Sequence, residues 1–125
     1  MVLVYLVSLS RPLALPRPLQ LPHNLSNIDA TYFLQNGVAG ACGTVHKDTD
    51  LVVAPQTAQY VNGDQCGRTI TITDNTTVKT TTGVVADECP TCNGSGSIDL
   101  SESLFKVFAP TSQGVFPVSW HFNAQ

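Results

Sequence analysis

Four cysteines are the feature that most restricts how this chain can fold. They are Cys42, Cys66, Cys89 and Cys92, and all lie where short strand-like segments alternate with turns. An even number of cysteines in a chain of 125 residues indicates two disulfides and an oxidising compartment. The residues alone leave every pairing of the four open. We therefore expect a small secreted domain that disulfides stabilise.

Two other uses of these cysteines are less favoured by their spacing. A four-thiolate zinc site usually needs two C-x-x-C knuckles, and only Cys89 and Cys92 stand at that spacing. A thioredoxin-like redox pair should open a helix, but the segment NGSG at 93–96 follows the pair and disfavours one. We expect no metal and no cofactor.

The composition excludes some classes of partner. Hydrophobic residues make up 42% of the chain and charged residues 12%, which is a globular composition rather than a disordered one. The net charge is −3 and the six basic residues are scattered, so the basic patch of a nucleic-acid-binding protein is missing. The same charge offers little attraction to an anionic membrane. We expect a secreted monomer that binds neither nucleic acid nor membrane.

The N-terminal segment differs from the rest of the chain. Residues 1–9 form an apolar run that is too short to span a bilayer, and four prolines within 11–22 exclude a helix there. A signal peptide would carry basic residues before the apolar run and small residues after it, and neither feature is clear. A signal peptide and an unprocessed tail both stay open. We expect a leader and proline-rich linker over residues 1–28 and one domain over residues 29–125.

From residue 29 onward, short strands alternate with Gly, Asn and Asp. The expected strands are 30–34, 51–54, 68–73, 78–86 and 115–123, and the expected helical turns are 55–60 and 101–108. The runs 68–73 and 78–86 form the best hairpin, because the first alternates apolar with polar residues and a turn signal separates the two. Many short strands with one or two short helices predict a mainly β protein that closes into a small barrel. Side chains fill such a barrel, so a ligand must bind in a surface groove.

An ordered set of short motifs carries a resemblance to a known superfamily. Along the chain these motifs are Ala30-Thr31-Tyr32, Gly40-Ala41-Cys42-Gly43, Cys66-Gly67, Val85-Ala86-Asp87-Glu88-Cys89-Pro90, Ser97-Ile98-Asp99-Leu100-Ser101 and Val118-Ser119-Trp120. In this order the set is similar to the domain shared by expansins, barwin, rare lipoprotein A and family 45 glycoside hydrolases. It resembles most the short fungal expansin-like proteins called loosenins. The resemblance covers residues 29–125 and implies an all-β fold, a six-stranded double-psi β-barrel.

The resemblance also implies a function and a disulfide pattern. It implies a secreted protein that binds cell-wall polysaccharide in a surface groove and loosens it without hydrolysis. Cellulose, chitin or a related glucan is the expected partner. Barwin-like pairing would join Cys42 to Cys89, which leaves Cys66 to pair with Cys92.

Asp99 is the site residue that the resemblance favours most. In the family, the aspartate of this motif lies in the groove, and in the related hydrolases it is the general acid. A general acid that works near neutral pH needs a raised pKa, and the apolar neighbours Ile98 and Leu100 help to provide such a setting. A second interpretation is that Asp99 caps the expected helix 101–108, with Glu102 following as in a capping box.

Four further residues are candidates for substrate binding. Asp87 matches a second groove aspartate of bacterial expansins, and Thr31 matches a groove threonine. Tyr32 and Tyr60 are candidates for stacking on sugar rings through their apolar faces. If they do not bind substrate, Asp87 is a solvated residue at a strand end and Thr31 is an ordinary outward-facing strand threonine. We expect Trp120 in the core, because it lies on the apolar face of its alternating strand.

The chain departs from the enzymes of this superfamily. Family 45 hydrolases place their catalytic base just after an aromatic pair, but no carboxylate follows 32–33, and Asp29 precedes that position. An acid without a base gives little hydrolysis, so we expect no enzyme. His46 stands in a context that does not match the lytic enzymes and is expected to be a solvated loop histidine.

Two alternative functions stay open. The first is a barwin-like protein-binding module, such as a cysteine-protease inhibitor or a plant–microbe interaction protein. A rigid barrel with two disulfides serves equally well to present binding loops. The second is a weak glycoside hydrolase or lytic transglycosylase.

Overall fold

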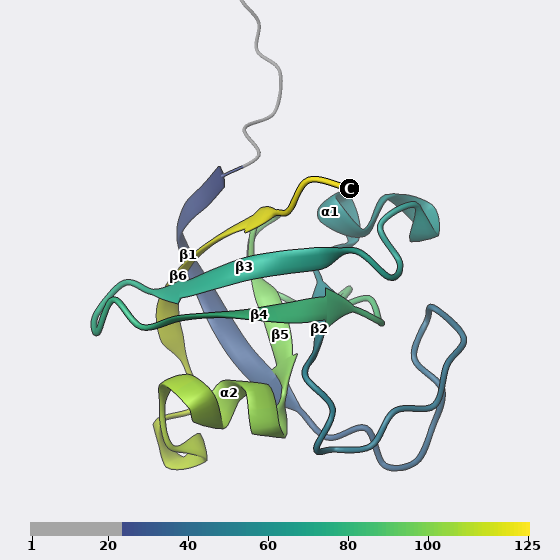
Figure 1. Ribbon diagram of the computed structural model, residues 1–125, viewed down its shortest axis with the longest axis horizontal. Coiled ribbons are helices and arrows are strands. Elements are labelled where there is room, and N and C mark those ends of the chain that lie inside the picture. The colour runs from purple at the N-terminus through teal and green to yellow at the C-terminus, as the bar shows by residue number, and fades with distance from the viewer. Residues whose placement is uncertain (1–23) are drawn as a thin grey trace, which may run out of the picture.

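Six strands and two short α-helices make up the barrel (Figure 1). The computed structural model describes residues 24–125. The strands are β1 (Asn24–Phe33), β2 (Val52–Pro55), β3 (Thr69–Asp74), β4 (Thr80–Val85), β5 (Ile98–Ser101) and β6 (Phe116–Phe122). The α-helices are α1 (Thr57–Tyr60) and α2 (Glu102–Phe108), and the 3-10 helices are η1 (Val61–Gly63) and η2 (Thr111–Gln113). None of the helices in this part of the chain has the length and apolar character needed to cross a membrane.

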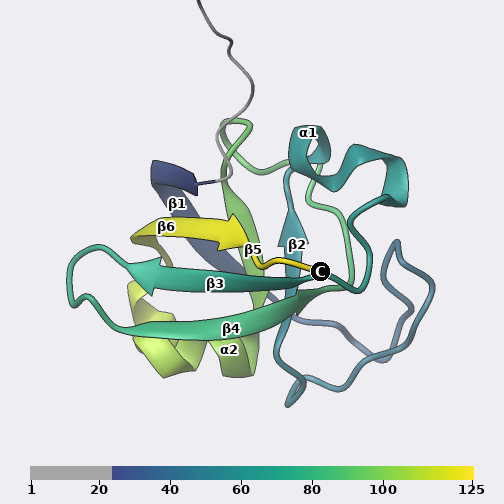
Figure 2. The ribbon, with the colours of Figure 1, turned by 45° about the horizontal axis from the view of Figure 1, so that its top comes forward.

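Every strand pairs with two others, so the sheet closes on itself in the order β1-β5-β2-β4-β3-β6. The pairs β1–β5 and β2–β4 are parallel, and the remaining pairs are antiparallel. The connections over 34–51 and 86–97 are long because they join β1 to β2 and β4 to β5, which are not neighbours in the sheet. As a result, β5 lies in the sheet between β1 and β2, two strands that are distant from it along the chain (Figure 2).

The closed, mainly β architecture and the main hairpin are confirmed. β3 and β4 pair antiparallel, with Thr69 opposite Val84 and Thr73 opposite Thr80. β2 and β6 fall on the predicted apolar and alternating runs. β3, β4 and β6 were accessible from local patterns because buried and more exposed positions alternate along them, and β2 because its four residues form a wholly buried apolar run.

Two strands differ from the sequence prediction. The sequence predicts no strand at Ile98–Ser101, yet these residues form β5, whose two edges pair with β1 and β2. β1 begins at Asn24 rather than at residue 30, because its first residues pair with β6. The predicted leader and linker lies outside the described residues over 1–23, and residues 24–28 belong to β1.

The barrel interior is filled by large apolar side chains. The most deeply buried are Trp120, Phe105, Phe116, Ile70, Ile72, Ile98, Leu100 and Leu104. Trp120 is 1% exposed and its indole N–H donates to the Gly96 carbonyl at 2.9 Å, so its predicted core position is confirmed. α2 places its buried residues against one side of the barrel, and its Phe105 ring packs 5.2 Å from Phe116.

The predicted disulfides Cys42–Cys89 and Cys66–Cys92 are wrong. Cys42 pairs with Cys66, and Cys89 pairs with Cys92. A tight turn, in which the Cys92 N–H donates to the Cys89 carbonyl at 3.4 Å, brings the second pair together. No cysteine in the described residues is free, which excludes the four-thiolate zinc alternative, because zinc binds thiolates.

Backbone hydrogen bonds at the end of β4 explain the first disulfide. The Val85 carbonyl accepts the Gly67 N–H at 2.9 Å, and the Ala86 carbonyl accepts the Cys42 N–H at 3.2 Å. Two loops are therefore held against the same short stretch of chain. Their cysteines, Cys42 and Cys66, come within 5.7 Å of each other at Cα, a separation that a disulfide spans.

Gly83→Ala should destabilise the barrel. A Cβ on Gly83 would stand 2.7 Å from Leu104 Cδ2 and 2.8 Å from Val53 Cγ2. Overpacking a dense core costs about 1–3 kcal/mol, so we expect the free energy of unfolding to fall by that amount. Thr82→Ala, at the exposed neighbouring position of β4, should change it by less than about 0.5 kcal/mol. Urea denaturation measures both, and a Gly83→Ala midpoint equal to that of the wild type would contradict this packing.

Candidate functional site

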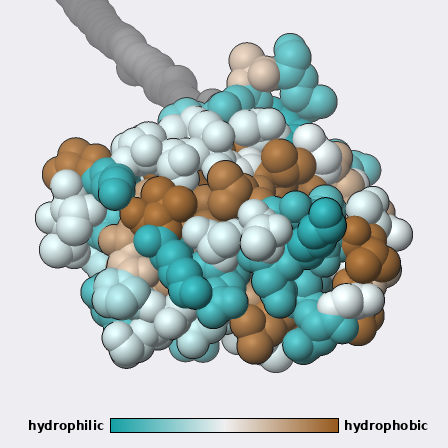
Figure 3. Space-filling model, turned by 60° about the horizontal axis from the view of Figure 1, so that its bottom comes forward, coloured by the Kyte–Doolittle hydropathy of each residue, from teal (hydrophilic) through white to brown (hydrophobic). Residues whose placement is uncertain are grey.

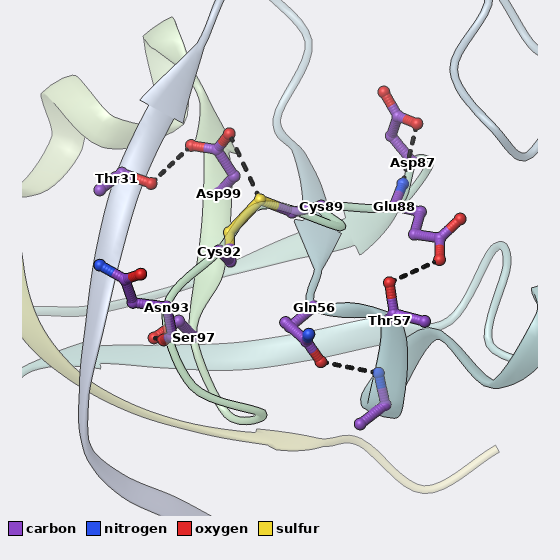
Figure 4. The surroundings of a disulfide bond; sticks show 11 residues. Thr31, Gln56, Thr57, Asp87, Glu88, Cys89, Cys92, Asn93, Ser97 and Asp99 are labelled. Carbon is purple, nitrogen blue, oxygen red and sulfur yellow. Dashed lines mark hydrogen bonds between the residues drawn. A yellow bond between two sulfur atoms is a disulfide. The ribbon is translucent and has the colours of Figure 1, made fainter.

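The register between β1 and β5 sets the candidate site. Thr31 lies opposite Asp99 in this parallel pair. Their neighbours Ala30, Ile98 and Leu100 are fully buried in the core. Because successive side chains of a strand point to opposite faces, Thr31 and Asp99 turn together to the outer face of the barrel (Figure 4).

The two oxygens of Asp99 have different neighbours. The Thr31 hydroxyl donates to Asp99 Oδ1 at 2.8 Å, and Asp99 Oδ2 lies 4.0 Å from Cys89 Sγ. Burial raises the pKa of the Asp99 carboxyl above its ordinary value of 3.8. The hydrogen bond from Thr31 lowers this pKa and the charge of Asp87 raises it, both by less than burial does. The net result is a carboxyl that holds its proton more readily than an exposed aspartate.

Asp99 opens onto a pocket of about 220 Å³, which we call the Asp99 pocket. Its lining residues are Asp29, Thr31, Cys89, Thr91, Cys92, Asn93, Ser97, Asp99 and Val115. The Ser97 hydroxyl donates to the Asn93 carbonyl, which fixes the loop at the rim. Among the described residues that line the pocket, none is a lysine, arginine or histidine. The pocket therefore offers hydroxyls, an amide and two carboxyl groups, which suits a ligand rich in hydroxyl groups.

Asp29 is a lining residue that sequence reasoning did not assign to the site. The sequence places it before the first strand, but β1 extends back to Asn24 and includes it. Asp29 stands two positions before Thr31, so the two side chains share a face of the strand. The alternation of side chains along the strand, extended from Thr31 toward the N-terminus, is the pattern that could have identified Asp29.

Asp87 holds a neighbouring loop rather than lining the Asp99 pocket. Its Oδ1 accepts the backbone N–H groups of Ala41 at 2.7 Å and of Glu88 at 2.8 Å. Asp87 borders a second pocket of about 260 Å³, lined otherwise by residues between 33 and 40. Asp87 therefore differs from a solvated strand-end residue, because backbone N–H groups bind its carboxylate. It does not share a pocket with Asp99, and its negative charge raises the pKa of Asp99.

The predicted sugar platforms Tyr32 and Tyr60 do not reach the Asp99 pocket. Tyr32 follows Thr31 on β1, so its ring turns to the opposite face and packs 5.1 Å from the Phe105 ring. Tyr60 is only 8% exposed, and its hydroxyl lies 3.6 Å from Cys66 Sγ. No aromatic residue of the described chain lines this pocket.

The capping interpretation of Asp99 is wrong. α2 begins after Ser101, which makes no side-chain capping bond to the helix. The Ser101 hydroxyl donates instead to the Asp50 carbonyl at 2.6 Å. Asp99 directs its oxygens to Thr31 and Cys89, away from the helix N-terminus.

The cluster of Cys89, Cys92 and Asp99 does not fit a metal centre. The sulfur and carboxyl oxygen atoms of these residues lie within 4.8 Å of one another. The two sulfurs form a disulfide, however, and a disulfide carries no thiolate charge with which to bind a metal. Asp99 is then the one member of this cluster that can still act as a ligand, and one ligand is too few for a transition-metal site.

The loop after β1 exposes several apolar side chains. Leu34 is 51% exposed, Val38 65% and Val45 60%. Figure 3 views the side of the molecule that carries α2 and this loop, and apolar residues appear there as separate patches among polar ones. Connecting loops often carry binding residues, and Leu34, Val38 and Val45 all belong to this one.

An acidic residue near the end of this loop stabilises its shape. Asp50 Oδ2 accepts the Lys47 N–H at 3.0 Å and lies 3.1 Å from His46 Nδ1. The hydrogen bond from the Lys47 backbone, followed by that from His46, lowers the pKa of Asp50 below its ordinary value. His46 is thus paired within a loop.

The arrangement of strands matches solved structures of two kinds. The Streptomyces papain inhibitor is 28% identical with a TM-score of 0.69, and the match covers 81% of this chain and 94% of the inhibitor. An expansin of Clavibacter michiganensis matches without ligand at 26% identity and a TM-score of 0.69. The match covers 80% of this chain and 50% of that expansin. This chain has the double-psi β-barrel fold of barwin-like proteins.

A second structure of the same expansin is an aspartate-to-asparagine variant in complex with cellohexaose. This barwin-like barrel matches it at 23% identity and a TM-score of 0.70, over 79% of its own length and 50% of the expansin. The chain thus spans about half the length of the expansin and nearly all of the inhibitor. No family model and no curated protein sequence matches the chain.

Titration of Asp99 tests the electrostatics of the site. We expect the pKa of Asp99 to lie above 3.8, because burial disfavours the charged form. Thr31→Val should raise this pKa further, because the hydrogen bond that stabilises the carboxylate is lost. Asp50 should titrate below 3.8 in the same ¹³C NMR spectra and serves as the internal reference. An Asp99 midpoint at or below 3.8, or a lower midpoint in Thr31→Val, would contradict this description of the site.

Proposed function

We propose that this protein is secreted and binds cell-wall polysaccharide in the Asp99 pocket, loosening contacts between polymer chains without hydrolysis. One observation carries the proposal. The Asp99–Thr31 pair faces a polar pocket on a barrel that shares its fold with an expansin solved in complex with cellohexaose. Cellulose is the first candidate polymer, and chitin or a related glucan is the next.

The pocket chemistry supports a sugar ligand. The edge of a sugar ring presents hydroxyl groups that both donate and accept hydrogen bonds. Thr31, Thr91 and Asn93 line the pocket with groups of the same dual character. Asp99 adds a strong acceptor when ionised and a donor when protonated. Since no aromatic residue lines the pocket, binding rests on hydrogen bonds along the ring edge rather than on stacking.

The carboxyl groups support a non-hydrolytic action. Glycoside hydrolysis needs two carboxyl groups on opposite sides of the scissile bond, one as acid and one as base or nucleophile. Asp87 is engaged by two backbone N–H groups and borders a different pocket. Asp29 stands on β1 two positions before Thr31, the partner of Asp99, so the carboxyl groups of Asp29 and Asp99 project from the same face of the sheet. A water molecule on the far side of the sugar would then have no base.

Inhibition of a cysteine protease is the second candidate function. It is favoured by the match to the papain inhibitor, which covers 94% of that protein. The exposed side chains of Leu34, Val38 and Val45 provide an apolar loop that a protein partner could cover. This function would use the loop at 34–45 and would not need Asp99.

Asp99→Ala should weaken binding to cellohexaose and to cellulose by about tenfold or more. A hydrogen bond to a charged group contributes about 1.5–3 kcal/mol, and about 1.4 kcal/mol corresponds to a tenfold change in affinity. Asp64→Asn is the matched control, because Asp64 is an exposed carboxylate that does not line the pocket. Calorimetry with cellohexaose and pull-down on cellulose and chitin measure affinity, and a reducing-sugar assay of each supernatant measures hydrolysis.

The outcomes separate the candidates. Polymer binding that depends on Asp99, without released sugar, supports the proposed function. Released sugar would overturn its non-hydrolytic part, and equal binding by Asp99→Ala would overturn the assigned site. No binding to any polymer, together with papain inhibition that Val38→Asp abolishes, would favour the second candidate.

A further inference from the structure

We infer that the Cys89–Cys92 disulfide exchanges with small thiols in the Asp99 pocket, and that Asp99 gives its proton to the departing Cys89 sulfur. This activity goes beyond polysaccharide binding and does not depend on it. The Cys89–Cys92 disulfide forms part of the pocket wall, beside the Asp99 carboxyl group (Figure 4).

The two cysteine residues differ in their exposure to solvent. Cys89 is 7% exposed, whereas Cys92 is partly exposed, and both line the pocket. An attacking thiolate approaches one sulfur in line with the S–S bond and expels the other. We therefore expect attack on the sulfur of the more exposed residue, Cys92, with the sulfur of the more buried Cys89 as the leaving group. The leaving sulfur is the one that lies 4.0 Å from Asp99 Oδ2.

The exchange balances without any further reactant. A thiolate RS⁻ forms a bond to Cys92 Sγ while the Cys89–Cys92 bond breaks, and the electron pair of that bond passes to Cys89 Sγ. The Asp99 carboxyl transfers its proton to Cys89 Sγ and becomes a carboxylate. A second thiolate then attacks the sulfur of R, forming RS–SR and releasing Cys92 as a thiolate that takes a proton from water. Two thiols are oxidised and one protein disulfide is reduced.

The charges around the sulfur explain why a proton donor is needed. Reactive cysteines usually have their thiolate stabilised by a cation or by a helix N-terminus. Neither is found here in the described residues, since no cationic residue lines the pocket and turns, not a helix, follow Cys92. The groups that face or act on Asp99 are the Thr31 hydroxyl, the charge of Asp87 and the second carboxyl of the pocket, Asp29. In these acidic surroundings Cys89 leaves more easily as a thiol than as a thiolate.

The size of the pocket indicates the class of thiol. The pocket volume of about 220 Å³ is below the range of about 300–1,000 Å³ that is usual for drug-sized ligands. A thiol of the size of cysteine or dithiothreitol therefore suits this space better than a larger one. The substrate class is therefore a low-molecular-weight thiol.

The second disulfide is an internal control in the same molecule. Cys42 and Cys66 are both partly exposed, so a small thiol can reach them. Their sulfurs contact the Val85 carbonyl at 4.0 Å and the Tyr60 hydroxyl at 3.6 Å, and no carboxyl group. This pair should react without help from a proton donor.

The experiment follows the reduction of each disulfide by dithiothreitol, with alkylation of the new thiols and peptide mapping by mass spectrometry. Rate constants are expressed per thiolate of the reagent, at several pH values from mildly acid to neutral. In the wild type, reduction of Cys89–Cys92 should be faster than that of Cys42–Cys66 at the lowest pH. This advantage should decline as pH rises through the pKa of Asp99, because the carboxylate has no proton to give.

Asp99→Asn should slow reduction of Cys89–Cys92 at the lowest pH by about tenfold or more and leave Cys42–Cys66 unchanged. Glu88→Gln is the matched control, because Glu88 is next to Cys89 in sequence but accepts the Thr57 hydroxyl at 2.8 Å. It should react as the wild type does. With glutathione as the reagent, the trapped mixed disulfide should be on Cys92.

Equal rate constants for the two disulfides at every pH would overturn the inference, and this test needs no variant. An Asp99→Asn rate equal to the wild-type rate, or a mixed disulfide on Cys89, would overturn it as well. Binding to cellohexaose is measured separately on the same proteins. The two proposals can therefore fail independently of each other.

Discussion

The parallel pairing of β1 with β5 is the constraint on which the core and the candidate site both depend. It places Ala30 beside Ile98 in the core and Thr31 beside Asp99 on the outer face. A slip of one residue would turn Asp99 inward and the buried Leu100 outward, at a cost in both burial and desolvation. Because β5 is also paired with β2, the register is fixed from both edges, and the site inherits the rigidity of the barrel.

The burial that stabilises the barrel also sets the chemistry of Asp99. The carboxyl stands at the boundary between the core and a polar pocket, so it loses part of its hydration and holds its proton more readily. Thr31 opposes this effect through a hydrogen bond, and Cys89 lies against the other oxygen. One partly buried group thus faces both a pocket that suits sugar hydroxyls and a disulfide that small thiols can reach. Asp99 is the residue that both proposed activities share.

Sequence patterns predict the parts of this fold that depend on neighbours along the chain. The hairpin of β3 and β4 and the alternation of β6 are of this kind, and so is the core position of Trp120. β5 could not be found in this way, because its alternation of apolar and polar residues covers only four positions and the helical pattern of 101–108 follows directly. The disulfide pairing follows from non-local hydrogen bonds at Val85 and Ala86, which no sequence spacing records.

The same distinction holds for the site. The motif that contains Asp99 predicted this residue as the centre of the site, and the structure places it beside Thr31 and in one pocket with Asp29. NMR mapping with cellohexaose on ¹⁵N-labelled protein tests most directly whether this pocket is the ligand site. We expect the backbone amide signals of Thr31, Asn93 and Asp99 to shift in a saturable way, while those of Val38 and Val45 stay in place. Shifts confined to the loop of Val38 and Val45, with the pocket signals unchanged, would contradict the assignment of the Asp99 pocket as the binding site.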